Sequence, residues 1–163
     1  MKKFLPFFAL LLLTLGCEGP TGPKGKDGNA NVQVTAGYVD PSSWNLSTTG
    51  FYFCEITDDH ITQSIVDNGT VLVYYSVNGD DWLLLPYTTV VDANNFYVMD
   101  ALHFVGKVQV RMRHSNPSTT VVPTTRRYFK IIAITSSSFG KYSDGDIDWN
   151  NYIEVKQKFN LQD

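Results

Sequence analysis

The strongest constraint on the fold is a series of short runs rich in β-branched and aromatic residues, each followed by a cluster of turn-forming residues. The clusters consist of Asn, Asp, Gly, Pro and Ser, a pattern typical of β-strands joined by tight turns. The runs cover residues 32–38, 51–56, 70–77, 82–88, 95–102, 104–113 and 126–134. The sequence therefore predicts an all-β domain, an antiparallel β-sandwich of about seven strands.

The clearest strand register lies in residues 107–113. Val108, Val110 and Met112 alternate with Lys and Arg residues and a Gln, so one face of this strand is expected in the core and the other in water. Residues 131–134 are apolar at every position, and residues 71–77 nearly so. Runs of that kind are typical of strands covered on both faces, so we expect these two segments to be central strands.

Two further elements are predicted from local signals. The Asn78-Gly79 turn signal lies between two strand-like runs, so residues 70–88 are expected to form a hairpin. Near the C-terminus, apolar and basic residues recur at helical spacing behind two aspartates, Asp146 and Asp148, either of which is suited to cap a helix. These recurring residues are Trp149, Tyr152, Ile153, Lys156 and Phe159. A short C-terminal helix is expected to dock on the edge of the sandwich.

The N-terminus has the pattern of an export signal. Lys2 and Lys3 precede an apolar run over residues 4–15, which is shorter than the roughly 17 to 25 residues that a membrane-spanning helix needs. Gly16 and Cys17 follow directly, as at the processing site of a bacterial lipoprotein. We therefore expect residues 1–16 to be a lipoprotein signal peptide and Cys17 to be the site of lipidation.

The next segment has glycine at every third position, at Gly19, Gly22, Gly25 and Gly28. This is the period of collagen, in which only glycine fits at the crowded helix axis. Two interpretations follow: an extended tether that holds the domain off the membrane, which we favour, or a short trimeric stalk. The predicted organisation is thus a signal peptide (1–16), a lipid anchor with a collagen-like tether (17–30) and a β-sandwich domain (31–163).

This N-terminal arrangement carries a resemblance to a known family. The Gly16-Cys17 junction followed by Glu18-Gly19-Pro20-Thr21-Gly22-Pro23-Lys24-Gly25 resembles short lipoproteins of the Bacteroidota with a collagen-like Gly-x-y segment before a small C-terminal domain. Looser likenesses lie in residues 71–87 and 148–161. The resemblance implies an anchored protein of the cell envelope, in the outer membrane and facing the periplasm or the surface. It brings no activity and no catalytic residue.

Charge and cysteine content exclude several classes of function. The chain has 13 Lys and Arg against 16 Asp and Glu residues, with a net charge of −3, and two of the basic residues belong to the leader. Nucleic acid is therefore not an expected partner. With Cys17 committed to lipid, Cys54 has no partner for an intrachain disulfide. It lies in a strand-like run, so we expect a buried, inert thiol rather than a nucleophile.

No motif indicates catalysis, a metal site or a cofactor. The three histidines, His60, His103 and His114, lack the spacing of metal ligands, and no nucleophile motif is present. The carboxylates of residues 144–148 resemble a calcium loop but lack the Gly and Glu that an EF-hand needs. A turn before the helix is favoured, and a cation site of another type is the alternative. Residues 58–60 and 80–81 are likewise expected to be solvated turns. We expect no enzyme.

Two features favour binding. Lys107, Arg111 and Arg113 share one face of their strand, and if that strand pairs with the one beginning at residue 126, Arg127 adds to a basic stripe. Such a stripe would bind polyanions such as envelope polysaccharide, or it serves only to prevent aggregation between sheet edges.

The second feature is the set of tryptophans near predicted loops, Trp44, Trp82 and Trp149. An indole ring in such a place can stack on a sugar ring, although we expect at least two of the three to pack in the core.

Three functional hypotheses follow. The first is a lipid-anchored, non-catalytic binding or interaction module of the envelope, with polysaccharide or another envelope protein as its partner. The second is a structural envelope protein that trimerises through the collagen-like segment, and the oligomeric state stays open. The third is a glycan hydrolase whose pair of carboxylates the sequence does not locate.

Overall fold

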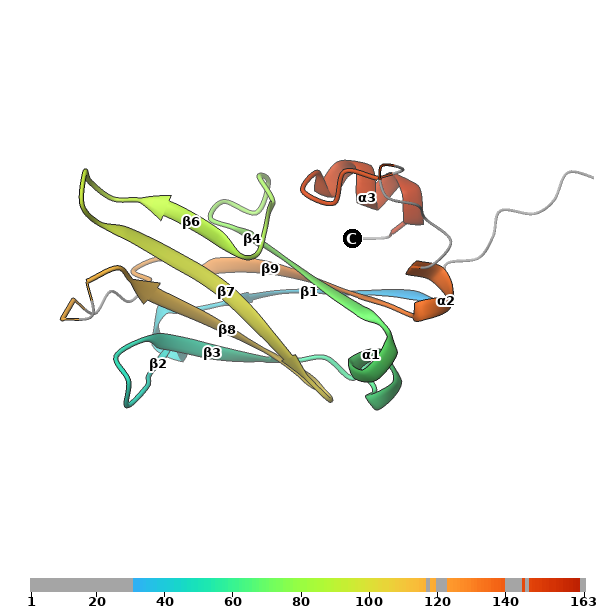
Figure 1. The fold of residues 1–163 in the computed structure, drawn as a ribbon, viewed down its shortest axis with the longest axis horizontal. Helices are drawn as coiled ribbons and strands as arrows, with labels where there is room; N and C mark the ends of the chain where they lie inside the picture. Colours follow the sequence, from blue (N-terminus) through green and yellow to red (C-terminus); the bar gives the residue numbers. More distant parts are fainter. Residues whose placement is uncertain (1–30, 117, 120–122, 140–144, 146, 162–163) are drawn as a thin grey trace, which may run out of the picture.

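The computed structural model describes residues 31–116, 118–119, 123–139, 145 and 147–161. The predicted signal peptide, Cys17 and the collagen-like segment lie outside these residues. The described chain forms two antiparallel sheets, packed face to face, and a short C-terminal helix, which confirms the predicted fold class (Figure 1). The elements are β1 (Val32–Val39), β2 (Asn45–Leu46), β3 (Tyr52–Thr57), α1 (Gln63–Asn68), β4 (Thr70–Ser76), β5 (Leu83–Leu84), β6 (Tyr87–Val90), β7 (Phe96–Phe104), β8 (Lys107–His114), β9 (Arg127–Ile134), α2 (Ser136–Phe139) and α3 (Tyr152–Phe159), with a 3-10 turn at Pro41–Ser43.

The strand order agrees with the prediction for the central strands. One sheet has the order β1-β9-β4-β5, and the other has the order β2-β3-β8-β7-β6. The two segments that are apolar on both faces, in β9 and β4, are neighbours in the middle of the first sheet. The alternation in β8 is also confirmed, because Val108, Val110 and Met112 are buried while the residues between them face outward.

The predicted hairpin over residues 70–88 is only half correct. Strand β4 pairs with β5 through Tyr74↔Leu84 and Tyr75↔Leu83, but β5 ends after two residues. Pro86 follows, and it has no backbone N–H to continue the ladder. From Tyr87 onward the chain belongs to the five-stranded sheet, where β6 pairs with β7. The run that looked like one strand therefore connects the two sheets.

The core between the sheets holds the inward side chains of both layers. Cys54, Val108 and Val110 from the five-stranded sheet meet Val73, Phe129 and Ile131 from the other. Helix α1 closes one end of this core with Ile65, and Thr62 caps it by accepting a hydrogen bond from the Ile65 backbone N–H. The chain then returns to β4 through Gly69, where a Cβ atom would lie 2.6 Å from the carbonyl oxygen of Ile134.

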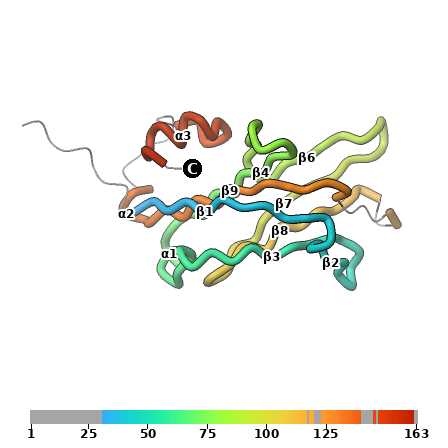
Figure 2. Tube along the Cα trace, turned by 180° about the vertical axis from the view of Figure 1, so that it is seen from behind, coloured from blue at the N-terminus to red at the C-terminus, as the bar shows by residue number. Residues whose placement is uncertain are grey.

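A second core lies between the outer face of the four-stranded sheet and α3. Tyr74 and Ile132 of the sheet pack against Val155 and Phe159 of the helix. Both views show α3 lying over this face, not on the edge of the sandwich as predicted (Figure 2). The reason is the apolar outer face of β4 and β9, which would otherwise be exposed to water.

The N-cap of α3 is Asn151 and neither of the two predicted aspartates. Its side-chain oxygen accepts hydrogen bonds from the backbone N–H groups of Ile153 and Glu154. Asp148 instead accepts from the backbone of Asn150 in the preceding turn, and Asp146 lies outside the described residues. In the described part of the chain, no helix is both long enough and apolar enough to span a bilayer.

Candidate functional site

A cavity of about 580 Å³ opens between the two sheets at one end of the sandwich. Each sheet contributes inward-facing side chains from the ends of its strands, and we call the space the mouth cavity. Its walls consist of Tyr75, Val77, Leu83 and Arg127 from the side of the four-stranded sheet, Tyr87, Thr89, Tyr97, Met99 and Met112 from the five-stranded sheet, and Pro123 and Thr124 before β9. The volume lies within the range of about 300 to 1,000 Å³ that is usual for small-molecule sites.

The strand register places these side chains together. Tyr87 pairs with Met99 and Thr89 with Tyr97, so alternate residues of β6 and β7 face the same side of their sheet. Thr88, which lies between two lining residues, faces the opposite side. Tyr75 comes from the facing sheet, where its ring lies 5.9 Å from that of Phe129. The walls are therefore mainly aromatic and thioether groups on regular strands.

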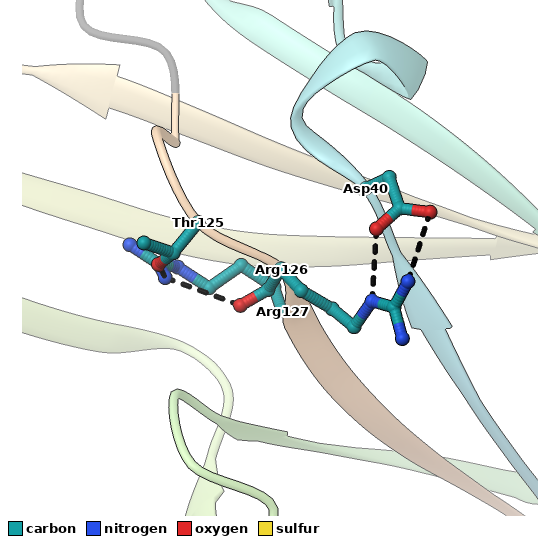
Figure 3. Close-up of polar contacts among 4 residues, drawn as sticks. All are labelled: Asp40, Thr125, Arg126 and Arg127. Atoms are coloured by element: carbon teal, nitrogen blue, oxygen red, sulfur yellow. Dashed lines mark hydrogen bonds and ion pairs between the residues drawn. The ribbon is translucent and has the colours of Figure 1, made fainter.

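Two consecutive arginines at the start of β9 point to opposite sides (Figure 3). Arg126 faces outward and donates to both carboxylate oxygens of Asp40, at 2.8 and 3.4 Å, and its guanidinium lies 3.7 Å from the ring centre of Tyr38. Arg127 has the inward parity of Phe129 and lines the mouth cavity. The exposed arginine is thus neutralised, and its neighbour brings a positive charge to the cavity.

The guanidinium of Arg127 is held at one of its nitrogens only. Its Nη1 donates to the hydroxyl of Thr125 and, at 3.3 Å, to the carbonyl oxygen of Arg126. Its Nε is shielded from solvent and has no hydrogen-bond partner among the described residues. No described carboxylate forms an ion pair with it. A half-buried charge with an unsatisfied donor is therefore part of the cavity wall.

The electrostatics of the cavity keep its buried phenol neutral. Burial raises the pKa of Tyr75, an effect that the positive charge of Arg127 partly offsets and that Tyr87 reinforces. The hydroxyl of Tyr75 therefore remains a hydrogen-bond donor at neutral pH. The described lining contains hydroxyl, thioether and guanidinium groups, which offer hydrogen bonds and apolar contacts to a ligand.

The cavity lies far from the start of the domain. At the other end of β9, Ile134 pairs with Val32, the first residue of β1. Arg127 and Ile134 are separated by the length of the strand, roughly 23 Å at about 3.3 Å per residue.

The predicted basic stripe is only partly assembled. Strands β8 and β9 do not form a hairpin, since they belong to different sheets, and Arg127 faces the cavity between the sheets and not the outer face of β8. The reason is that β9 finds apolar neighbours on both sides in β1 and β4. Lys107, Arg111 and Arg113 do share the outer face of β8, as expected, but each has an acidic partner.

Those acidic partners come from the neighbouring strands. Lys107 lies 2.8 Å from Glu55 on β3, and its hydrogen bond lowers the pKa of that carboxyl group. Arg111 contacts Asp100 on β7 at 2.6 Å, and Arg113 contacts the other oxygen of Asp100. Polyanion binding by this face stays a prediction, with a weaker electrostatic basis than the sequence suggested.

The remaining candidates have mostly structural surroundings. Cys54 is 1% exposed, which confirms that it is buried, and burial raises the pKa of its thiol to about 12. Its low reactivity stays a prediction. Trp44 lies in the core between the sheets, and the other two tryptophans pack against the core under α3. Asp144, like Asp146, lies outside the described residues. Among the residues that the structure describes, no group of His, Cys, Asp and Glu is arranged to hold a metal.

One acidic residue differs from its prediction. Asp58 was expected in a solvated turn, but it is 3% exposed. Its Oδ1 accepts from the backbone N–H of His60 and contacts the ring Nδ1 of the same residue at 3.0 Å, so the carboxylate is turned inward to hold the loop. Its Oδ2 has no partner among the described residues.

The sequence did not point to the mouth cavity. Its described lining residues come from six strands and two loops, and most of them appear in the sequence as ordinary strand residues. The available signal was the pair Arg126-Arg127 at the start of a strand, where alternation must send one arginine inward. Comparisons with protein-family models, with curated proteins and with solved structures find no match for this chain.

Proposed function

We propose that this protein is a non-catalytic binding module, anchored in the cell envelope through a lipid on Cys17, and that the mouth cavity is its ligand site. The observation that carries this proposal is the cavity itself. It combines a ligand-sized volume, walls of aromatic and apolar side chains and, among the described lining residues, one charged group on a regular strand. Proteins that only pack against neighbours have no need of such a space.

The chemistry of the walls supports binding rather than turnover. Tyr75, Tyr87 and Tyr97 present flat rings and hydroxyl groups, and Met99 and Met112 adapt their shape to an apolar ligand. Anchoring rests on the N-terminal pattern, in which one cysteine carries both the processing signal and the site of acylation. A tethered domain with a ligand pocket would bind small molecules at the surface of a membrane.

A blocked cavity tests the ligand site. Thr89→Trp places an indole in the lining, whereas Thr88→Trp places the same group on the outer face of the same strand and serves as the matched control. With naphthalene sulfonamide as a small neutral probe, we expect binding by isothermal titration to the wild type and to Thr88→Trp, and loss of binding in Thr89→Trp. Equal binding by all three proteins would refute the proposed site, and so would the absence of wild-type binding to both this probe and the anionic naphthalene sulfonate.

A cysteine substitution tests the anchor. Cys17→Ala removes the acylation site, so we expect either release of the domain from membranes or accumulation of the unprocessed precursor. Detergent-phase partitioning of metabolically labelled protein distinguishes these outcomes from wild-type behaviour. A variant of mature length that still carries lipid label would show that the assignment of Cys17 is wrong.

A further inference from the structure

We propose that the mouth cavity selects small amphipathic anions, molecules with an apolar or aromatic body and one carboxylate, sulfonate or phosphate group, and that Arg127 binds the anionic group. This inference rests on the proposed function, because it assumes that the cavity holds a ligand. It adds the sign of the ligand's charge and the residue that recognises it. The alternative is an uncharged ligand for which Arg127 only forms part of the wall.

The distribution of charge within the protein distinguishes Arg127 from the other arginines. Arg111 and Arg113 are paired with Asp100, and Arg126 is paired with Asp40. Arg127 alone among them has no acidic partner among the described residues. The domain therefore neutralises its outward arginines and leaves the inward one available for an anion from outside.

The surroundings of Arg127 make an anion the matching ligand. Guanidinium groups are planar forks that suit carboxylate, sulfonate and phosphate oxygens, and their hydrogen bonds to anions are stronger than those to neutral acceptors. The Nε of Arg127 is shielded from solvent and unpaired within the described chain, and a buried donor without a partner is unfavourable. The Nη2 of Arg127 also has no hydrogen-bond partner within the described chain and, unlike Nε, is open to solvent, so an anion in the cavity would bind there and neutralise the charge, whereas a purely apolar ligand would leave it unpaired.

The rest of the lining limits the ligand to an amphipathic one. Leu83, Met99 and Met112 surround the space with apolar atoms, and the rings of Tyr75 and Tyr97 offer faces for stacking. A small inorganic anion would leave most of this apolar wall in contact with water. Tyr75, whose pKa is raised by burial, keeps its proton and adds a hydroxyl donor rather than a competing negative charge.

Two probes of nearly equal shape test this inference. Naphthalene sulfonate carries the anionic group, and naphthalene sulfonamide is its neutral counterpart. Binding of each is measured by isothermal titration to the full chain as the cell produces it, purified in detergent, with detergent alone as the blank. The variants are Arg127→Met, which keeps an unbranched apolar side chain, Arg127→Lys, which keeps the charge, and Arg126→Met, which removes the neighbouring charge outside the cavity.

We expect Arg127→Met to weaken sulfonate binding by about tenfold or more, the effect of losing a charged hydrogen bond, and to change sulfonamide binding by about twofold or less. Arg127→Lys should recover part of the loss, because the charge returns without the planar fork. Arg126→Met should leave both affinities near wild type. Thermal melting of each variant verifies the fold, and Arg127→Gln replaces Arg127→Met if the latter unfolds.

Three results would overturn the inference. Equal weakening of both probes by Arg127→Met would show that Arg127 acts only through packing. If Arg126→Met weakens sulfonate binding as much as Arg127→Met does, the effect comes from the net charge of the domain and not from a contact with Arg127. The wild type could also bind both probes with equal affinity and lose both in Thr89→Trp. That result would support the proposed ligand site but refute its selectivity for anions. If neither the sulfonate nor the sulfonamide binds, both proposals are refuted.

Discussion

The ammonium group of Lys130 donates a hydrogen bond to the hydroxyl of Tyr152 at 3.0 Å and lies 4.2 Å from the centre of the same ring. Trp82 covers it from another side, at 4.5 Å. Lys130 belongs to β9 and is 7% exposed, and Tyr152 is the first residue of α3. A buried cation held by aromatic rings therefore joins the helix to the sheet.

Truncation of Tyr152 should weaken this contact between α3 and β9. We expect Tyr152→Ala to lower the free energy of unfolding by about 3 to 5 kcal/mol, because it removes a buried ring and exposes Lys130 to an empty space. Tyr152→Phe keeps the ring and removes only the hydroxyl, so a loss of about 1 kcal/mol is expected. Urea unfolding measures both, with Ile153→Ala at an exposed position as the control. An equal loss in all three variants would contradict the assigned contact.

The cap of α3 provides a second test. Asn151→Ala removes the side-chain oxygen that accepts from two backbone N–H groups, so we expect a loss of about 1 kcal/mol in thermal or urea unfolding. Asn150→Ala, one residue earlier and exposed, should change stability much less. The reverse order would mean that the helix begins before Tyr152.

The thiol of Cys54 should be unreactive while the domain is folded. In a protein carrying Cys17→Ala it is the only thiol, since the chain has two cysteines. Its pKa of about 12 leaves almost no thiolate at pH 8, so mass spectrometry should find alkylation only after unfolding in urea. Rapid labelling of the native protein would contradict this placement.

The raised pKa of Cys54 also has a pH consequence. The folded state favours the protonated thiol, so this stabilising contribution is complete below the ordinary pKa of 9.0 and is lost as pH rises towards 12. Cys54→Ala should therefore show a smaller decrease in stability over that interval than the wild-type residue. Identical pH profiles would indicate that the thiol is not desolvated.

The pairing of Asp100 makes a prediction for the outer face of β8. Asp100→Asn removes the carboxylate that neutralises Arg111 and Arg113, so retention on an anionic polysaccharide column at low salt should increase. Asp92→Asn changes the net charge equally in the turn before β7, where the carboxylate forms no ion pair with those arginines, and should have less effect. If both variants shift equally, retention follows net charge alone and the face is not a polyanion site.

The buried and exposed faces of the longer strands were predictable, because they depend on local alternation. The pattern of β8 places Val108 and Val110 inside, and the apolar runs of β4 and β9 identify central strands, since burial on both faces requires apolar side chains on both. The C-terminal helix was predictable because its apolar residues recur at helical spacing. Its cap was not, because Asp148 and Asn151 are equally suited residues and only the backbone geometry distinguishes them.

Which strands pair with one another was harder to predict than where the strands lie in the sequence. Adjacent strands in sequence usually pair, yet β8 and β9 do not. Strand β9 lies instead between β1 and β4, where the apolar side chains on both of its faces are buried. The mouth cavity depends on that choice, since it places Arg127 opposite Tyr87 and Met99 rather than beside Arg113. A site assembled from the ends of strands in two sheets has no signature in any single segment.

The opposite positions of Val32 and Arg127 along the sandwich give the anchored protein a polarity. If lipid at Cys17 holds the chain to a bilayer, the tether joins the domain at the end that carries Val32, and the opening beside Arg127 lies at the opposite end. Ligands would then arrive from the aqueous compartment and not by lateral diffusion in the membrane. The protein would sample solutes that pass the envelope surface, at a height set by the length of its tether.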